Sequence, residues 1–163
     1  MGTTEDFEEF ARAQIPRLYR TAWLLVGDRH LAEDLVQDTL ANLLKVWHRV
    51  ESPGAYARTT LVRTFISQRR RKSWAERPTG DVPELAAERV GDPELRIALQ
   101  SALAELAPLD RAVLVLRFFE DRSVEQVALD LGKKTSAITT RTARALDRLR
   151  AVLGADADQL IAL

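Results

Sequence analysis

The strongest constraint on the fold is a pattern of two short helices separated by a tight turn at residues 123–150. Ser123 can cap the first helix while Gln126 reaches back to it, which is the reciprocal arrangement of a capping box. Gly132 follows the last apolar residue of that helix, where the backbone commonly takes a positive φ. A second helical pattern begins shortly afterwards, so the segment predicts a helix-turn-helix.

The second helix of this pair begins with small or hydroxylated side chains, which can approach the edges of DNA bases. Two arginines follow at positions suited to phosphate contacts. The candidate DNA-binding residues are Lys134, Thr135, Ser136, Ala137, Thr139, Thr140, Arg141 and Arg144. An ordinary helical hairpin with a solvated polar face is the alternative interpretation.

Charge is segregated along the chain although the formal net charge is zero. Residues 58–77 carry seven basic residues and one acid, whereas residues 78–94 carry five acids and one arginine. Zero net charge argues against binding of nucleic acid over the whole surface. The zero net charge is instead the average of these opposed basic and acidic blocks.

The composition also bounds the class of protein. No apolar run approaches the length of a membrane span, and the absence of cysteine excludes a disulfide framework or a thiolate metal site. The segment from Thr4 to Glu9 is acidic where an export signal would need basic residues. We expect a soluble, cytoplasmic chain.

Residues 77–91 contain two prolines and two glycines without a sustained apolar period, which predicts a linker. Helical patterns flank it, at 6–25, at 31–50 and from 53 onward on one side, and from 93 and from 108 on the other. Pro16 predicts a kink or a break in the first helix. We therefore expect an all-α fold of two small helical domains joined by a flexible linker, with an N-terminal helical bundle at 1–76, an acidic linker at 77–91, a helix-turn-helix domain at 92–155 and a short tail at 156–163.

The helix expected at residues 31–50 has two apolar stripes, although one stripe is enough to bury a helix against a small core. The first contains Leu31, Leu35, Leu43 and Val46, and the second contains Val36, Leu40, Leu44 and Trp47. The second stripe is either buried as well or forms an exposed patch that docks a partner.

A run of four adjacent cations, Arg69 to Lys72, follows the third helix and lies close to Trp74. Cations that hold a phosphate backbone beside rings that stack on bases are typical of proteins that bind single-stranded nucleic acid. A solvated helix end is the alternative. Adjacent cations repel one another without a polyanion, which favours nucleic-acid binding.

Several of these segments resemble the small alternative sigma factors of bacterial RNA polymerase known as the extracytoplasmic-function group, and among them the actinobacterial SigE-type subgroup. Residues 18–22 and 32–38, LYRTA and AEDLVQD, resemble region 2 of that family. Residues 53–56, PGAY, with the arginines that follow resemble the part of region 2 that melts and reads the minus-10 promoter element. Residues 106–111, LAPLDR, with the helix-turn-helix resemble region 4, which reads the minus-35 element.

The resemblance implies roles for particular residues. The minus-35 contacts would come from the eight residues named above for DNA binding. The minus-10 contacts would come from Arg49, Ser52, Arg58, Arg63, Arg69, Arg70, Arg71 and Lys72. Core polymerase would be bound by Asp34, Leu35, Gln37, Asp38, Leu40, Leu43 and Trp47, which would explain the second apolar stripe.

The partners implied are core RNA polymerase, through its β′ clamp helices and its β flap, and promoter DNA, with an anti-sigma factor as a further candidate from the family alone. No cofactor is implied. An autonomous regulator that binds a palindromic operator as a dimer is the main alternative, but no clear self-complementary interface is evident. An enzyme is not expected, because His30 and His48 are isolated from any ligand-like spacing.

Overall fold

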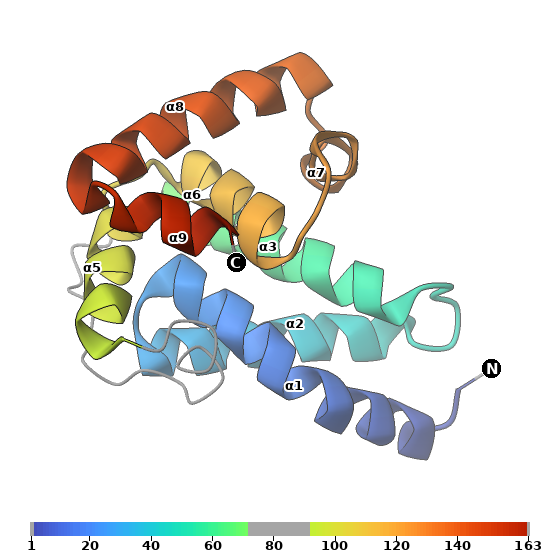
Figure 1. Ribbon diagram of the computed structural model, residues 1–163. Coiled ribbons are helices and arrows are strands. Elements are labelled where there is room, and N and C mark those ends of the chain that lie inside the picture. The colour runs from blue at the N-terminus through green and yellow to red at the C-terminus, as the bar shows by residue number, and fades with distance from the viewer. Residues whose placement is uncertain (1, 72–91, 163) are drawn as a thin grey trace.

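The computed structural model describes residues 2–71 and 92–162 (Figure 1). Throughout these residues the regular structure is helical and includes no strand, which confirms the all-α prediction. The predicted linker at 77–91 lies outside the described residues. The division of the chain into domains therefore stays a prediction.

The N-terminal half consists of α1 (Thr4–Val26), α2 (Arg29–Val46) and α3 (Pro53–Arg71). Thr3 and Asp6 form a capping box at the start of α1, and Gly27 ends that helix with φ at 72°. Asp28 then caps α2 by accepting a hydrogen bond from the Leu31 N–H at 3.0 Å. These caps explain why two long helices can be joined by a very short turn.

Helix α1 continues through Pro16, so of the kink or break that the sequence predicts, the break does not occur. Proline removes one backbone hydrogen bond, whereas the following turns bury Leu18, Ala22 and Leu25 in the core. Burial on this scale is worth about 1.5–3 kcal/mol for each large apolar side chain, which offsets the local cost. Packing therefore overrides the helix-breaking tendency of Pro16.

The C-terminal half consists of α5 (Pro93–Ala104), α6 (Pro108–Leu114), the π-helical turn η1 (Val115–Phe119), α7 (Val124–Leu131), α8 (Thr135–Leu153) and α9 (Asp156–Ala162). Asp92 caps α5 ahead of Pro93, as expected. The π-helical turn interrupts what the sequence pattern presents as one continuous helix from Pro108. It ends at Glu120, whose N–H bonds to the carbonyl of Val115 at 3.0 Å.

The two halves pack directly against each other (Figure 1). Helix α1 contacts α5, α6 and η1, while α3 contacts α6 and α7. The buried apolar side chains accordingly form one core that runs through both halves, from Leu25 and Leu61 to Leu103 and Leu116. The structure is therefore a closed arrangement of the two halves.

Candidate nucleic-acid interface

The helix-turn-helix forms as the sequence predicts. The Ser123 Oγ accepts from the Gln126 N–H at 3.1 Å, and the Gln126 Oε1 accepts from the Ser123 N–H at 3.0 Å. Gly132 ends α7 with φ at 64°, and α8 begins at Thr135. This local chemistry sets where the second helix of the motif begins.

Helix α8 has one buried side and one exposed side. Ile138, Thr142, Ala145 and Leu149 are buried. The candidate residues Lys134, Thr135, Ser136, Thr139 and Thr140 are exposed, and Ala137 is half-buried. The N-terminal part of α8 therefore presents a polar surface that can enter a major groove.

Two threonines on this surface already use their hydroxyl hydrogens within the helix. The Thr139 Oγ1 donates to the Thr135 carbonyl at 3.0 Å, and the Thr140 Oγ1 donates to the Ser136 carbonyl at 3.0 Å. Each hydroxyl oxygen keeps lone pairs that can accept. In this arrangement they are suited to accept from the amino groups of cytosine or adenine.

The two arginines of the motif share one buried carboxylate. The Arg141 Nη1 lies 2.8 Å from the Asp110 Oδ1, and the Arg144 Nη2 lies 3.5 Å from the same oxygen. The Asp110 side chain comes from α6 and is 7 % exposed, so it can orient the guanidinium groups of both arginines. The other N–H groups of the two arginines remain available for phosphates. We did not single out Asp110 from the sequence, although it lies in the LAPLDR segment.

The candidate minus-10 residues are dispersed over α3 and the turn before it. Arg49 and Ser52 are exposed at the turn between α2 and α3. The Arg58 side chain is half-buried and its Nε has no hydrogen-bond partner in the described part of the chain. Burial lowers the pKa of Arg58, and the positive charge of Arg122 adds to that effect.

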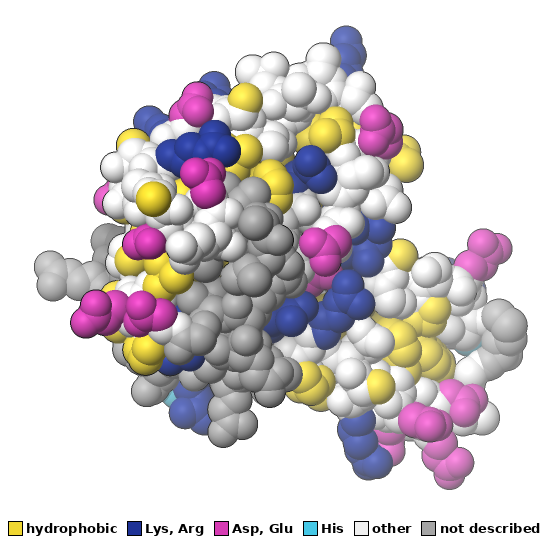
Figure 2. All heavy atoms as spheres, in the orientation of Figure 1, with side chains coloured by type: hydrophobic (Ala, Val, Ile, Leu, Met, Phe, Trp, Pro, Cys, Tyr) yellow, Lys and Arg dark blue, Asp and Glu magenta, His cyan; other side chains and the backbone are white. Residues whose placement is uncertain are grey.

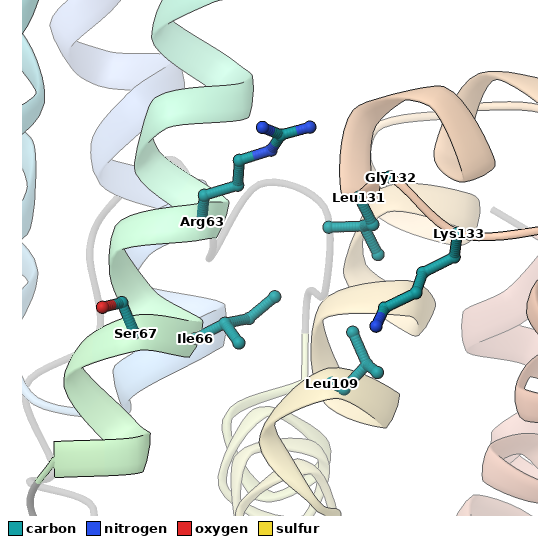
Figure 3. A pocket seen from close by; sticks show the side chains of 7 residues that line it. All are labelled: Arg63, Ile66, Ser67, Leu109, Leu131, Gly132 and Lys133. Atoms are coloured by element: carbon teal, nitrogen blue, oxygen red, sulfur yellow. The ribbon is translucent and has the colours of Figure 1, made fainter.

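Arg63 turns toward the C-terminal half, since its Nε donates to the Asp130 carbonyl at 2.8 Å. It lines a cavity of about 420 Å³ between α3 and the helix-turn-helix (Figure 3). Ile66 and Ser67 come from α3, while Leu109 and Lys133 face them across the cavity. The side chains of Arg69, Arg70 and Arg71, and the whole of Lys72, lie outside what the structure describes.

A second cavity, of about 370 Å³, lies where α1, the start of α3 and the end of η1 meet. Arg17, Arg58 and Arg122 line it together with Glu120. Figure 2 shows Lys and Arg side chains gathered where the two halves meet on this face of the molecule. The described lining of this second cavity thus carries three arginines and one carboxylate.

The candidate polymerase-binding residues of α2 divide into two groups. Asp34, Gln37 and Asp38 are exposed, and Leu40 and Trp47 are half-buried. Leu35 and Leu43 instead lie in the core, with exposed fractions of 1 % and 0 %. In this conformation they hold the helix in place and do not form part of its outer surface.

The second apolar stripe of α2 is partly buried and partly exposed. Val36 is buried, Leu40 is half-buried and Trp47 packs against Phe7 and Phe10 with ring centroids 5.4 Å apart. Leu44 is 49 % exposed. Sequence reasoning placed Leu44 in the stripe but not among the binding residues. Its exposure makes it the large apolar residue of α2 that is most available to a partner.

Two kinds of feature are absent from the described residues. No group of three or more His, Cys, Asp or Glu side chains could hold a metal ion within the described ranges. No helix in those ranges has the length and apolar character needed to cross a membrane. His30 is exposed, with its Nδ1 4.0 Å from the Glu33 carboxylate.

Comparison with known proteins gives consistent matches over both halves. The family described as Sigma-70 region 2 matches residues 10–75, and the family described as Sigma-70, region 4 matches residues 96–149. The RNA polymerase sigma-E factor of Streptomyces coelicolor is 36% identical over 92% of this chain and 87% of its own length. The ECF RNA polymerase sigma factor SigL of Mycobacterium tuberculosis is 30% identical over 83% of this chain and 82% of its own length.

Similarity extends to a solved structure. The sigma factor RpoE of Bartonella quintana, crystallised in complex with the anti-sigma factor NepR, aligns with a TM-score of 0.75 and 26% identity. The alignment covers 94% of this chain and 99% of that chain, so it includes both halves.

Proposed function

Because this chain belongs to the extracytoplasmic-function group of the sigma-70 family, we propose that it is an alternative sigma factor that binds core RNA polymerase, recognises minus-35 and minus-10 promoter elements and melts DNA to start transcription. The observation that carries the proposal is that one chain holds both a region 2 match and a region 4 match, with a helix-turn-helix whose polar side is exposed.

The minus-35 element would be read by α8. Its exposed hydroxyls would face base edges, and Arg141 and Arg144, oriented by Asp110, would contact neighbouring phosphates. Because these phosphate contacts are few, the C-terminal half alone would bind DNA weakly, and the slope of its log affinity against log salt would be shallow.

The minus-10 element would be read by the turn before α3 and by α3 itself. Arg49 and Ser52 are exposed there and would lie beside a base extruded from the opened duplex. Arg58, Arg63 and the run of cations from Arg69 to Lys72 would hold the separated strand through its phosphates. The cost of unpairing is a few kcal/mol per base, which such contacts can offset.

Polymerase would be bound in two places. The exposed residues of α2 (Asp34, Gln37 and Asp38) with Leu40, Leu44 and Trp47 would dock on the β′ clamp helices, while Leu35 and Leu43 would support that surface from beneath. The C-terminal half would dock on the β flap. Docking at both places fixes the distance between the DNA-reading surfaces, so only promoters with a matching spacer would be bound by both.

The remaining aspects of the proposal follow from the family. The chain would act as a specificity subunit without an enzymatic reaction of its own, and it would work in the cytoplasm where polymerase is found. The linker at residues 77–91 would separate region 2 from region 4. An anti-sigma factor is proposed as a regulatory partner, by extension from the complex in which the RpoE relative was solved.

The test is in vitro transcription from a pool of genomic fragments, using core RNA polymerase with and without this chain. New start sites preceded by two shared elements at fixed spacing would support a sigma factor and identify its promoter. No core-dependent transcription, combined with tight binding of the free protein to palindromic DNA, would instead support an autonomous regulator.

A further inference from the structure

The second cavity, where α1, the start of α3 and the end of η1 meet, holds more positive than negative charge. Arg17, Arg58 and Arg122 line it, and Glu120 is the one acidic residue in its described lining. The Arg17 side chain is 56 % exposed, whereas the Glu120 side chain is 3 % exposed. The charged groups of the cavity therefore extend from the interior to the protein surface.

Two of the three arginines already have a carboxylate partner. The Arg17 Nε and Nη2 donate to the Glu120 Oε2 at 3.2 and 2.8 Å. The Arg122 Nε and Nη2 donate to the two carboxylate oxygens of Asp130 at 3.0 and 2.9 Å. Glu120 and Asp130 are the acids whose charge acts on Arg58, so both are engaged by another arginine.

Arg58 is left without a partner of opposite charge. In the described part of the chain its side chain is half-buried, and its Nε is buried with no hydrogen-bond acceptor. Burial lowers the pKa of Arg58, and the neighbouring charge of Arg122 lowers it further. A cation held in this way costs folding free energy unless an opposite charge is supplied. The free chain thus presents a guanidinium that an anion from outside the chain would stabilise.

The donors around the cavity suit a phosphate group. A guanidinium pairs with phosphate oxygens through parallel N–H bonds, and it has more N–H donors than one carboxylate uses. Arg17 and Arg122 therefore keep N–H groups for a second anion. Ser52 adds a hydroxyl to the same lining.

The cavity also has room for more than the phosphate group itself. Its volume of about 370 Å³ falls within the range of small-molecule sites, which is roughly 300–1,000 Å³. A Cβ added to Gly54, which lines the cavity at the start of α3, would meet no atom within 4 Å. The start of α3 is therefore open to a ligand.

We propose that this cavity binds a small phosphorylated molecule, with Arg58 as the residue that holds the phosphate group and with Arg17, Arg122 and Ser52 as further donors. The site combines side chains from both halves of the chain. It therefore differs from the DNA strand contact proposed for Arg58, in which only the N-terminal half takes part. The inference rests on the charges and the cavity, and it does not depend on the sigma-factor function.

The first measurement is thermal unfolding of the full-length chain in chloride and in pyrophosphate at equal ionic strength. A ligand that binds only the folded chain raises Tm in a concentration-dependent way, and we expect pyrophosphate to do so for the natural chain. Arg58→Met keeps the aliphatic stem but removes the guanidinium. It should be at least as stable as the natural chain in chloride, because an uncompensated charge is lost, and it should gain nothing from pyrophosphate.

The second measurement is calorimetric titration of the same proteins with pyrophosphate. Arg58→Met should weaken binding at least about tenfold, because a charge-assisted hydrogen bond is lost. Arg58→Lys keeps the charge but not the fork of donors, so its affinity should lie between the two. The matched control is Arg12→Met, which removes the same charge from an exposed position of α1 and should leave the affinity unchanged.

A single-stranded oligonucleotide without terminal phosphates separates the two sources of phosphate. If the natural chain binds the oligonucleotide but not pyrophosphate, and R58M binds neither, Arg58 serves DNA alone and the proposal is overturned. It is also overturned if R58M binds pyrophosphate as tightly as the natural chain, or if R12M loses as much affinity as R58M.

A lower stability of R58M in chloride would also overturn the proposal, because it would show that Arg58 already has a partner within the chain. None of these measurements uses core polymerase. A failed transcription test would therefore reject the sigma-factor function while leaving the phosphate site to be judged by its own data.

Discussion

Two adjacent leucines of α2, Leu43 and Leu44, allow the proposed polymerase-binding surface to be tested separately from the core. Leu43 is fully buried, and Leu43→Asp would lose about 1.5–3 kcal/mol of apolar burial and place a carboxylate in the core at a cost of several kcal/mol more. The sum approaches the whole stability of a typical domain. We expect this variant to unfold the N-terminal half.

Leu44 lies on the same helix but is 49 % exposed. Because about half of its side chain is already solvated, Leu44→Asp should cost only about 1 kcal/mol of folding stability. If a partner covers this residue, the loss of apolar contact and the desolvated charge should cost about 2 kcal/mol or more in binding, which is at least about a thirtyfold loss of affinity.

The assay pairs thermal unfolding, followed by circular dichroism, with titration of a labelled chain against core RNA polymerase. Leu44→Ala serves as the control for shape, since it removes apolar contact without adding charge, and it should weaken binding less than the aspartate. A folded L44D variant that binds core polymerase as tightly as the natural chain would refute the docking surface proposed for α2.

Three further predictions concern the helix-turn-helix. Ser123→Ala removes half of the capping box and should lower the free energy of unfolding by about 1 kcal/mol in a denaturant titration. Gly132→Ala should cost a similar ~1 kcal/mol because its φ of 64° is strained for alanine, while the added Cβ would meet only the Arg63 guanidinium at 3.9 Å; equal stability would contradict that reasoning. Arg144→Ala should weaken binding to promoter DNA and reduce the slope of log affinity against log salt by about 1, and an unchanged slope would remove it from the phosphate contacts. Arg141→Ala is a poorer probe of DNA contact, because it also removes the closer cation from the buried Asp110.

The helix-turn-helix could be predicted from the sequence because its signals are local. A capping box, a helix-ending glycine and a single apolar side fix where each helix begins and ends without reference to the rest of the chain. The order of the helices along the chain could be predicted for the same reason. Pro16 shows the limit of local rules, since packing of the following turns keeps α1 continuous.

The contacts between the halves could not be predicted in this way. Glu120 and Arg17 are 103 positions apart, and Arg111 and Leu24 are 87 apart, so no periodicity links them. A helical stripe also identifies apolar residues without stating which of them stays at the surface. The family resemblance assigns Leu35 and Leu43 to partner binding, whereas the structure buries both and leaves Leu44 exposed.

The direction in which the Glu120 side chain points depends on the number of residues in the π-helical turn at Val115–Phe119. A π turn contains one residue more than the α-helical turn it replaces, and each residue of an α-helix turns the chain by about 100° and advances it by about 1.5 Å. Deletion of a single codon between Leu114 and Glu120 would restore regular winding and rotate the carboxylate away from Arg17. The position of the Glu120 carboxylate thus depends on one extra residue in this turn. A one-residue deletion there would break the ion pair between Arg17 and Glu120 without changing any of the side chains proposed to contact DNA.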